Sequence, residues 1–110
     1  MTDQIVVLST CASEQEAERL ARMLVDRRLA ACVSVVPGVQ SFYRWQGAVE
    51  SAAEWLLLAK SSRALFPALS SALEQEHSYD VPEVLALPVV AGAEKYLNWM
   101  LSNLRTEDEP

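Results

Sequence analysis

The chain has 110 residues, of which 51% are hydrophobic, with a formal net charge of −6 and a pI near 4.7. This length predicts one domain, residues 1–104, with enough apolar side chains for a core that requires neither disulfides nor a structural metal. The acidic balance argues against a protein that binds along the phosphates of nucleic acid.

The two cysteines, Cys11 and Cys32, lie in apolar, strand-like settings without a CxxC spacing. Buried, reduced thiols of a cytosolic protein are the simplest interpretation of this pattern. The first residues, 1–4, predict no signal peptide, and no apolar stretch approaches the length of a membrane span. We therefore expect a cytoplasmic protein with no membrane partner.

The first predicted elements are a buried strand and an amphipathic helix. Residues 5–8 form a short apolar run typical of a strand buried on both faces. Ser13 and Glu16 have the spacing of a capping box, which marks the start of a helix. The apolar face of that helix is formed by Ala17, Leu20, Ala21, Leu24 and Val25. Arg27 and Arg28 are expected to close it, with the charge that a helix C-terminus favours.

Two long strands joined at Gln46-Gly47 are predicted next. Residues 30–43 carry no charged side chain, and the return strand, 49–60, has a solid apolar centre. A strand of roughly 16 residues spans about 50 Å, whereas a compact domain of this size is only about 34 Å across. The hairpin must therefore bend, for which Pro37-Gly38 offers a place, or extend beyond its own domain. An uncharged ribbon of this kind pairs with other strand edges, so we predict an oligomer.

The rest of the chain repeats the alternation of helix and strand. A second helix is predicted to open near Ser61-Ser62, with Pro67 in or near its first turn. The segment 77–82 breaks the helical pattern and leads to a strand over residues 83–89. A third helix follows Gly92, and residues 105–110 form a polar tail that we expect to be disordered. The apolar faces of the two helices are Leu65, Leu69, Ala72 and Leu73, and then Ala93, Tyr96, Leu97, Met100, Leu101 and Leu104.

This order of elements, β-α-β-β-α-β followed by a helix, predicts an α+β fold of the ferredoxin-like, split βαβ type. Helices cover one face of such a sheet. Because the first and third strands are apolar on both faces, neighbouring subunits are expected to cover the other face.

Five segments of the sequence resemble the CutA family of divalent-cation tolerance proteins, in the order in which that family carries them. They are residues 29–33 (LAACV), 43–47 (YRWQG), 56–60 (LLLAK), 77–83 (HSYDVPE) and 96–99 (YLNW). The resemblance implies a tight homotrimer whose hairpin strands pair between subunits, similar in shape to nitrogen-regulatory signal-transduction proteins. It also implies a role in metal tolerance, with copper or another divalent cation as the bound ion.

The loop from His77 to Glu83 is the candidate site, because an imidazole, a phenol and carboxylates lie close together there. One interpretation is a polar pocket at a subunit junction, with His77 as a metal ligand or proton carrier. The other is a helix C-terminus, in which His77 bonds the last carbonyls and Tyr79 packs. The family pattern has proline where this chain has Ser78, and often glutamate where it has Asp80.

The candidate metal ligands are His77, Cys11 and Glu76. In the family, the suggested copper ligands are this histidine and a thiol near the end of the first strand, at the position of Ser9 here. Cys11 lies two residues later and would face the same side if the strand continues that far. Glu76, beside His77, would suit a harder ion. With one histidine per chain, a multi-imidazole copper site within one subunit is excluded.

A ligand pocket between subunits is expected to involve Cys32, Tyr43, Trp45, Lys60, Tyr79 and Glu83. Lys60 would bind an anion or simply end a strand in solvent, and Tyr43 and Trp45 would stack on a ligand or pack in an interface. The motifs of hydrolases, P-loop proteins, zinc proteases and dinucleotide-binding proteins are missing, so we expect no enzyme. The alternatives are a trimeric scaffold that binds another protein, and an enzyme that uses His77, Tyr79 or Glu83 as acid or base.

Overall fold

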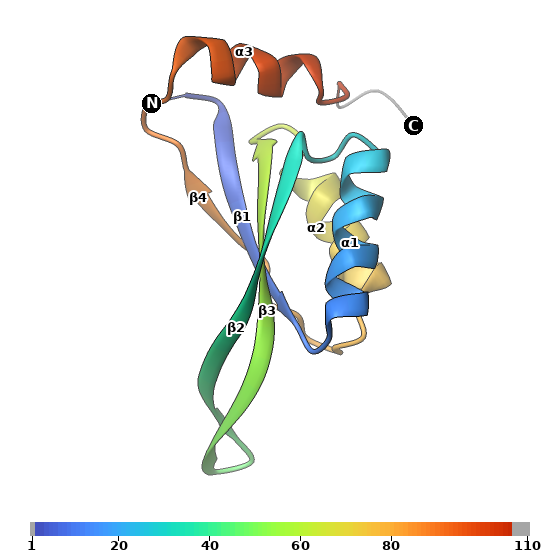
Figure 1. Ribbon diagram of the computed structural model, residues 1–110, viewed down its shortest axis with the longest axis vertical. Coiled ribbons are helices and arrows are strands. Elements are labelled where there is room, and N and C mark those ends of the chain that lie inside the picture. Colours follow the sequence, from blue (N-terminus) through green and yellow to red (C-terminus); the bar gives the residue numbers. More distant parts are fainter. Residues whose placement is uncertain (1, 107–110) are drawn as a thin grey trace.

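The computed structural model describes residues 2–106 and has an α+β fold (Figure 1). Four antiparallel strands form one sheet in the order β2-β3-β1-β4, and three helices accompany it. In chain order the elements are β1 (Gln4–Cys11), α1 (Glu14–Asp26), β2 (Cys32–Trp45), β3 (Ala48–Ser62), α2 (Phe66–Glu76), β4 (Leu85–Pro88) and α3 (Glu94–Ser102). This is the predicted order of strands and helices.

Strand β1 and helix α1 form as their sequence patterns predict, with two differences in side-chain burial: one face of β1 and one residue of the apolar face of α1 are less covered than expected. The strand continues to Cys11, and the Ser13 hydroxyl accepts a hydrogen bond from the Glu16 N–H at 3.1 Å, which caps the helix. Ile5 and Val7 are buried, but Val6 and Leu8 on the other face are only half-buried in the single chain. The helix ends at Asp26, and its predicted apolar residue Val25 is exposed.

The hairpin of β2 and β3 turns at Gln46 and Gly47, as predicted. Both residues have positive φ, 50° and 82°, as a type I′ turn requires. The predicted bend also occurs: Val36 pairs with Leu56 and Val39 with Glu54, so β2 advances three residues while β3 advances two. The extra residue forms a bulge at Pro37-Gly38, where Gly38 has a φ of 74°.

Three boundaries in the second half differ from the sequence prediction. Ser61 and Ser62 do not open a helix: they end β3, because Ser61 pairs with Ile5 and Ser62 with Gln4 of β1. Helix α2 begins at Phe66, with Pro67 in its first turn as expected. Strand β4 covers only 85–88, about half of the predicted 83–89. Of the predicted tail, the Arg105 N–H donates to the Arg28 carbonyl, and residues 107–110 lie outside the described residues.

The core lies between one face of the sheet and helices α1 and α2, which cover the same face (Figure 1). Leu20 and Leu24 of α1, Leu69 and Leu73 of α2, and Leu57 of β3 are among its largest buried side chains. Helix α3 lies across the end of the sheet that is remote from the hairpin turn, where Met100 and Leu104 are buried. Within the described chain, none of these helices is long and apolar enough to span a membrane.

The hairpin extends beyond the rest of the molecule, as its length predicts. The longest dimension is 44 Å, against 29 and 22 Å for the other two, and the turn forms one end of the long axis (Figure 1). Phe42, Trp45 and Val49 in this extension are 72%, 58% and 68% exposed. Large apolar side chains thus lie in solvent in the single chain.

The cap on α1 gives a test of the local fold. Ser13→Ala should lower the free energy of unfolding by about 1 kcal/mol, because the Glu16 N–H loses its acceptor. Ser70→Ala is the control: its hydroxyl reaches only the exposed Glu74 carboxylate, at 3.4 Å, so a change below about 0.5 kcal/mol is expected. Guanidinium unfolding at one protein concentration measures both, and equal effects would contradict the assignment.

Candidate functional site

Five polar or titratable residues from three parts of the chain meet where the loop after α2 crosses β1 and the start of α1. We call this group the His77 cluster; it consists of Glu16, Glu54, His77, Ser78 and Tyr79. The loop is the one that the sequence singled out. Glu16 and Glu54, which hold it in place, come from α1 and β3 and were not among the predicted site residues.

His77 is buried and both of its ring nitrogens are engaged. Nε2 lies 2.8 Å from the Thr10 carbonyl, and Nδ1 lies 3.0 Å from the Tyr79 N–H. A neutral ring that carries its proton on Nε2 satisfies both contacts, donating to Thr10 and accepting from Tyr79. The His77 N–H donates to the Leu73 carbonyl and ends α2. The imidazole therefore fastens the loop to β1, and does not bond the last helix carbonyls as one interpretation of the sequence expected.

The two carboxylates of the cluster are hydrogen-bonded to the same loop. Glu16 accepts from the Ser78 N–H at 2.7 Å and from the Ser78 hydroxyl at 2.9 Å. Burial of Glu16 opposes its ionisation, but these hydrogen bonds outweigh it, so its pKa lies below the ordinary value. The Tyr79 hydroxyl donates to Glu54 at 2.6 Å. Burial and this charged neighbour raise the pKa of Tyr79, which stays protonated.

The predicted metal ligands do not form a ligand set within one chain. The Cys11 thiol is fully buried, and burial, aided by the charge of Glu16, raises its pKa to about 11. Metals bind the thiolate, which is therefore disfavoured here. The Glu76 carboxylate lies 3.5 Å from Arg19 and 3.6 Å from Arg27, at the surface. Across residues 2–106, no three His, Cys, Asp or Glu side chains are grouped to hold an ion.

The predicted pocket residues fall into separate places in one chain. Cys32 and Lys60 are paired across β2 and β3, and the Lys60 ammonium lies 3.8 Å from the thiol and 2.5 Å from the Ser34 hydroxyl. Tyr43 and Trp45 lie beside the hairpin turn, eleven or more residues along β2, a separation of about 36 Å in a strand. Tyr79 belongs to the His77 cluster, and Glu83 is exposed in the loop that follows it.

A sequence signal could have revealed one of the two carboxylates that the prediction missed. Glu54 interrupts an otherwise apolar stretch of β3, and it is 6% exposed. A buried charge in such a place requires a partner, which is Tyr79. Glu16 was interpreted as half of a capping box, but its carboxylate bonds Ser78, sixty-two residues away. Only the three-dimensional structure identifies that partner.

These features define an α+β protein with one four-stranded antiparallel sheet, an overhanging hairpin and a buried polar cluster at the α2–β4 loop. A family model described as "CutA1 divalent ion tolerance protein" matches residues 5–103. The chain therefore belongs to the CutA1 divalent ion tolerance family.

Named relatives agree with this assignment. The divalent-cation tolerance protein CutA of Thermus thermophilus is 48% identical over 89% of this chain and 95% of its own length. A solved structure of the protein from that organism superposes with a TM-score of 0.90, at 46% identity, over 93% of this chain and 99% of that one. The chloroplastic CutA of Arabidopsis thaliana is 43% identical over 92% of this chain, which spans only 56% of that relative.

The Glu16 carboxylate gives a test of the cluster. Because its folded pKa is depressed, its contribution to stability is present above the unfolded pKa, near 4.5, and is lost as the pH falls through the folded pKa. Glu16→Gln should therefore destabilise the protein at pH 7, and the difference from the parent should shrink below pH 4.5. Unfolding free energies between pH 3 and 7 measure this.

Glu18→Gln is the matched control for that series, because the Glu18 side chain is 62% exposed on the same helix. It should change stability little at any pH. A constant difference between Glu16→Gln and the parent across the whole range would contradict the assigned role of the Glu16 charge.

Proposed function

We propose that this protein acts in divalent-cation tolerance as a homotrimer of ferredoxin-like subunits, with a ligand pocket formed between subunits. The observation that carries the proposal is the apolar surface left uncovered in the single chain. The antiparallel strand order β2-β3-β1-β4 supports the ferredoxin-like plan. The number three rests on the resemblance to the family.

The face of the sheet opposite α1 and α2 carries apolar side chains that need cover. Cross-strand partners project on the same side of a sheet, so the strand pairings define rows of neighbours on that face. One row contains Leu85, Leu8 and Leu58 from three adjacent strands. The next contains Leu56 and Val36. Leu85 and Val36 are exposed in the single chain, and the others are half-buried.

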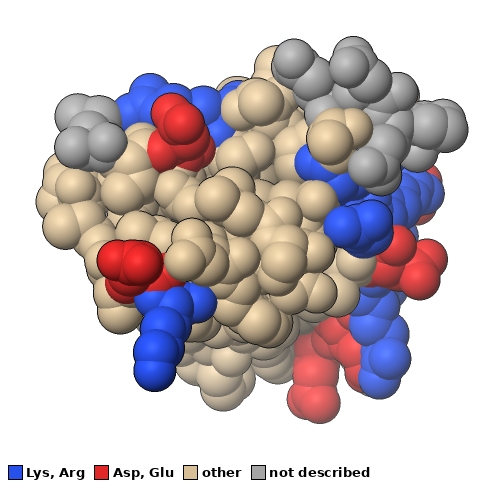
Figure 2. Space-filling model, turned by 90° about the horizontal axis from the view of Figure 1, so that it is seen from above, with Lys and Arg blue, Asp and Glu red and all other residues tan. Residues whose placement is uncertain are grey.

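Two further surfaces favour association. The outer edge of β2, fourteen residues long, has no neighbouring strand within residues 2–106, so its backbone groups can pair with another chain. Seen from above, a broad area without charged side chains occupies the middle of the surface, and Lys, Arg, Asp and Glu gather toward its rim (Figure 2). Exposed apolar residues of α3, which lies at this end, are Tyr96, Trp99 and Leu101.

The spacing of the predicted pocket residues also favours a site shared between chains. Tyr43 and Trp45 beside the turn cannot reach Cys32 and Lys60 of the same chain, because the two pairs lie at opposite ends of β2. A neighbouring chain whose hairpin lies against this sheet can bring them together. We propose that Tyr79 and Glu83 border the same pocket. Among these residues, Lys60 supplies positive charge for an anionic ligand group.

A copper site of His77, Cys11 and Glu76 remains a prediction that the geometry of one chain does not favour, since each of the three is engaged elsewhere. We propose a cytoplasmic, non-catalytic protein that binds no nucleic acid. The protonated Cys11 thiol, which is a poor nucleophile, and the hydrogen bonds that occupy His77 support the absence of catalysis. The net charge of −6 argues against binding of nucleic acid.

Assembly is tested with charge placed on the hairpin. The parent should sediment as a trimer at micromolar concentration, and Phe42→Glu should shift it toward monomers, because a carboxylate would be buried in an apolar interface. Gln46→Glu, in the turn, is the control and should leave the trimer unchanged. Sedimentation velocity and native mass spectrometry measure the mass. A monomeric parent would overturn the proposal, pocket included.

The metal ligands are tested by calorimetric titration of Cu²⁺ and Zn²⁺. Because His77 already makes two hydrogen bonds, we expect His77→Gln to change any divalent-ion affinity by less than about threefold. Loss of saturable binding in His77→Gln and in Cys11→Ser, with the mass of the assembly unchanged, would instead establish the predicted site.

A second candidate function, a scaffold for another protein, is favoured by the same apolar surfaces, and a single stoichiometric protein partner would support it.

A further inference from the structure

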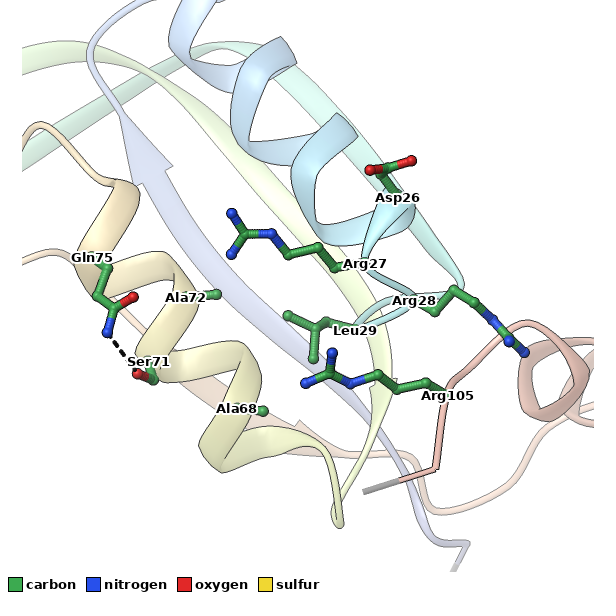
Figure 3. A pocket seen from close by; sticks show the side chains of 9 residues that line it. All are labelled: Asp26, Arg27, Arg28, Leu29, Ala68, Ser71, Ala72, Gln75 and Arg105. Carbon is green, nitrogen blue, oxygen red and sulfur yellow. Dashed lines mark hydrogen bonds between the residues drawn. The ribbon is translucent and has the colours of Figure 1, made fainter. Parts of the chain in front are cut away.

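A cavity on the helical side of the molecule, distinct from the His77 cluster, is lined by arginines. It lies between the C-terminal end of α1, the middle of α2 and the segment that follows α3, and has a volume of about 570 Å³ (Figure 3). Arg27, Arg28 and Arg105 line it, together with Ser71 and Gln75 of α2. From the sequence alone, Arg27 and Arg28 indicate only the end of a helix.

The side chains that line this cavity are not equivalent. The guanidinium groups of Arg27 and Arg105 project into the space that faces α2, whereas Arg28 and Asp26 point away from it (Figure 3). Leu29 and Ala72, both buried, form an apolar floor between them. The cavity therefore presents two positive groups above an apolar base.

Hydrogen bonds between distant segments hold the arginines in this arrangement. The Arg105 N–H donates to the Arg28 carbonyl at 3.0 Å. The Arg28 side chain in turn donates to the carbonyls of Ser102 and Leu104, at 3.4 and 3.3 Å. Arg28 thus ties the end of α1 to the end of α3, and Arg105 is placed opposite α2 as a result.

The charge and hydrogen-bonding groups of the cavity match an oxyanion. Arg27 lies 3.6 Å from Glu76, but that carboxylate is shared with Arg19 and is partly exposed, so solvent screens the pair. Guanidinium groups bind phosphate through paired N–H donors, and the Ser71 hydroxyl and the Gln75 amide supply neutral donors. The chain has a net charge of −6, so two positively charged guanidinium groups that face one cavity are a local exception to its acidic character.

We propose that this cavity binds the phosphate group of a small metabolite, with Arg27 and Arg105 on the phosphate oxygens and the apolar floor beneath the rest of the molecule. A volume of this size accommodates a compact phosphorylated metabolite. The site is separate from the pocket proposed between subunits, so it stands or falls independently of the proposed function.

Calorimetric titration of the full chain with inorganic pyrophosphate tests the site. The parent should bind with saturation, and Arg27→Gln should weaken binding at least tenfold, because a charge-assisted pair of hydrogen bonds is lost. Ser71→Ala should weaken it by a smaller factor. The matched control is Arg22→Gln, an exposed arginine of α1 that does not line the cavity; it should leave the affinity unchanged.

Three outcomes would overturn the proposal: no saturable binding, equal losses in Arg22→Gln and Arg27→Gln, or binding of citrate as tight as that of pyrophosphate. The last would indicate attraction by charge without recognition of phosphate. Residues 107–109 are acidic and follow shortly after Arg105 in sequence. A full-length variant with the corresponding amides there should bind pyrophosphate at least as tightly as the parent, and weaker binding would contradict the assigned role of Arg105.

Discussion

Strand β3 has two different environments along its length, one inside the sheet and one in the hairpin. The arrangement of the core and of the hairpin depends on this division. From Trp55 to Lys60 it lies between β1 and β2, and the helices bury the side chains on one of its faces. From Ala48 to Glu54 it pairs with β2 alone. A two-stranded ribbon has little stability of its own in water. The core at one end of β3 therefore holds in place a hairpin whose apolar surface is left for another chain.

The loop after α2 depends on the same strand and on its neighbour β1. Tyr79 donates to Glu54, at the point where β3 leaves the core, and His77 bonds the Thr10 carbonyl near the end of β1. Ser78 bonds Glu16 at the start of α1. Three consecutive loop residues thus contact three different elements. The polar side chains that attract attention in the sequence are occupied in holding this junction together, and this accounts for the poor fit of a metal to them within one chain.

Patterns that are local in sequence could be predicted, and those that depend on distant partners could not. The turn at Gln46-Gly47, the bulge at Pro37-Gly38 and the cap at Ser13 each follow from the conformational preferences of the residues themselves. The assignment of Ser61-Ser62 to a helix was wrong, because serine suits a helix cap as well as a strand end. Its pairing with Ile5 decides between them. Arg27 and Arg105 of the helical cavity are 78 residues apart in the sequence, and only the fold brings them together.

The overhang of the hairpin has a consequence for local opening. Backbone amides exchange with solvent at rates set by the free energy of the smallest opening that exposes them. In an isolated chain, protection along β2 and β3 should decline steadily from the ladder with β1 toward Gly47, as a ribbon frays. Contacts with other subunits would keep the amides near the turn protected as well. The protection of amides along β2 and β3 therefore reports whether another chain covers the hairpin.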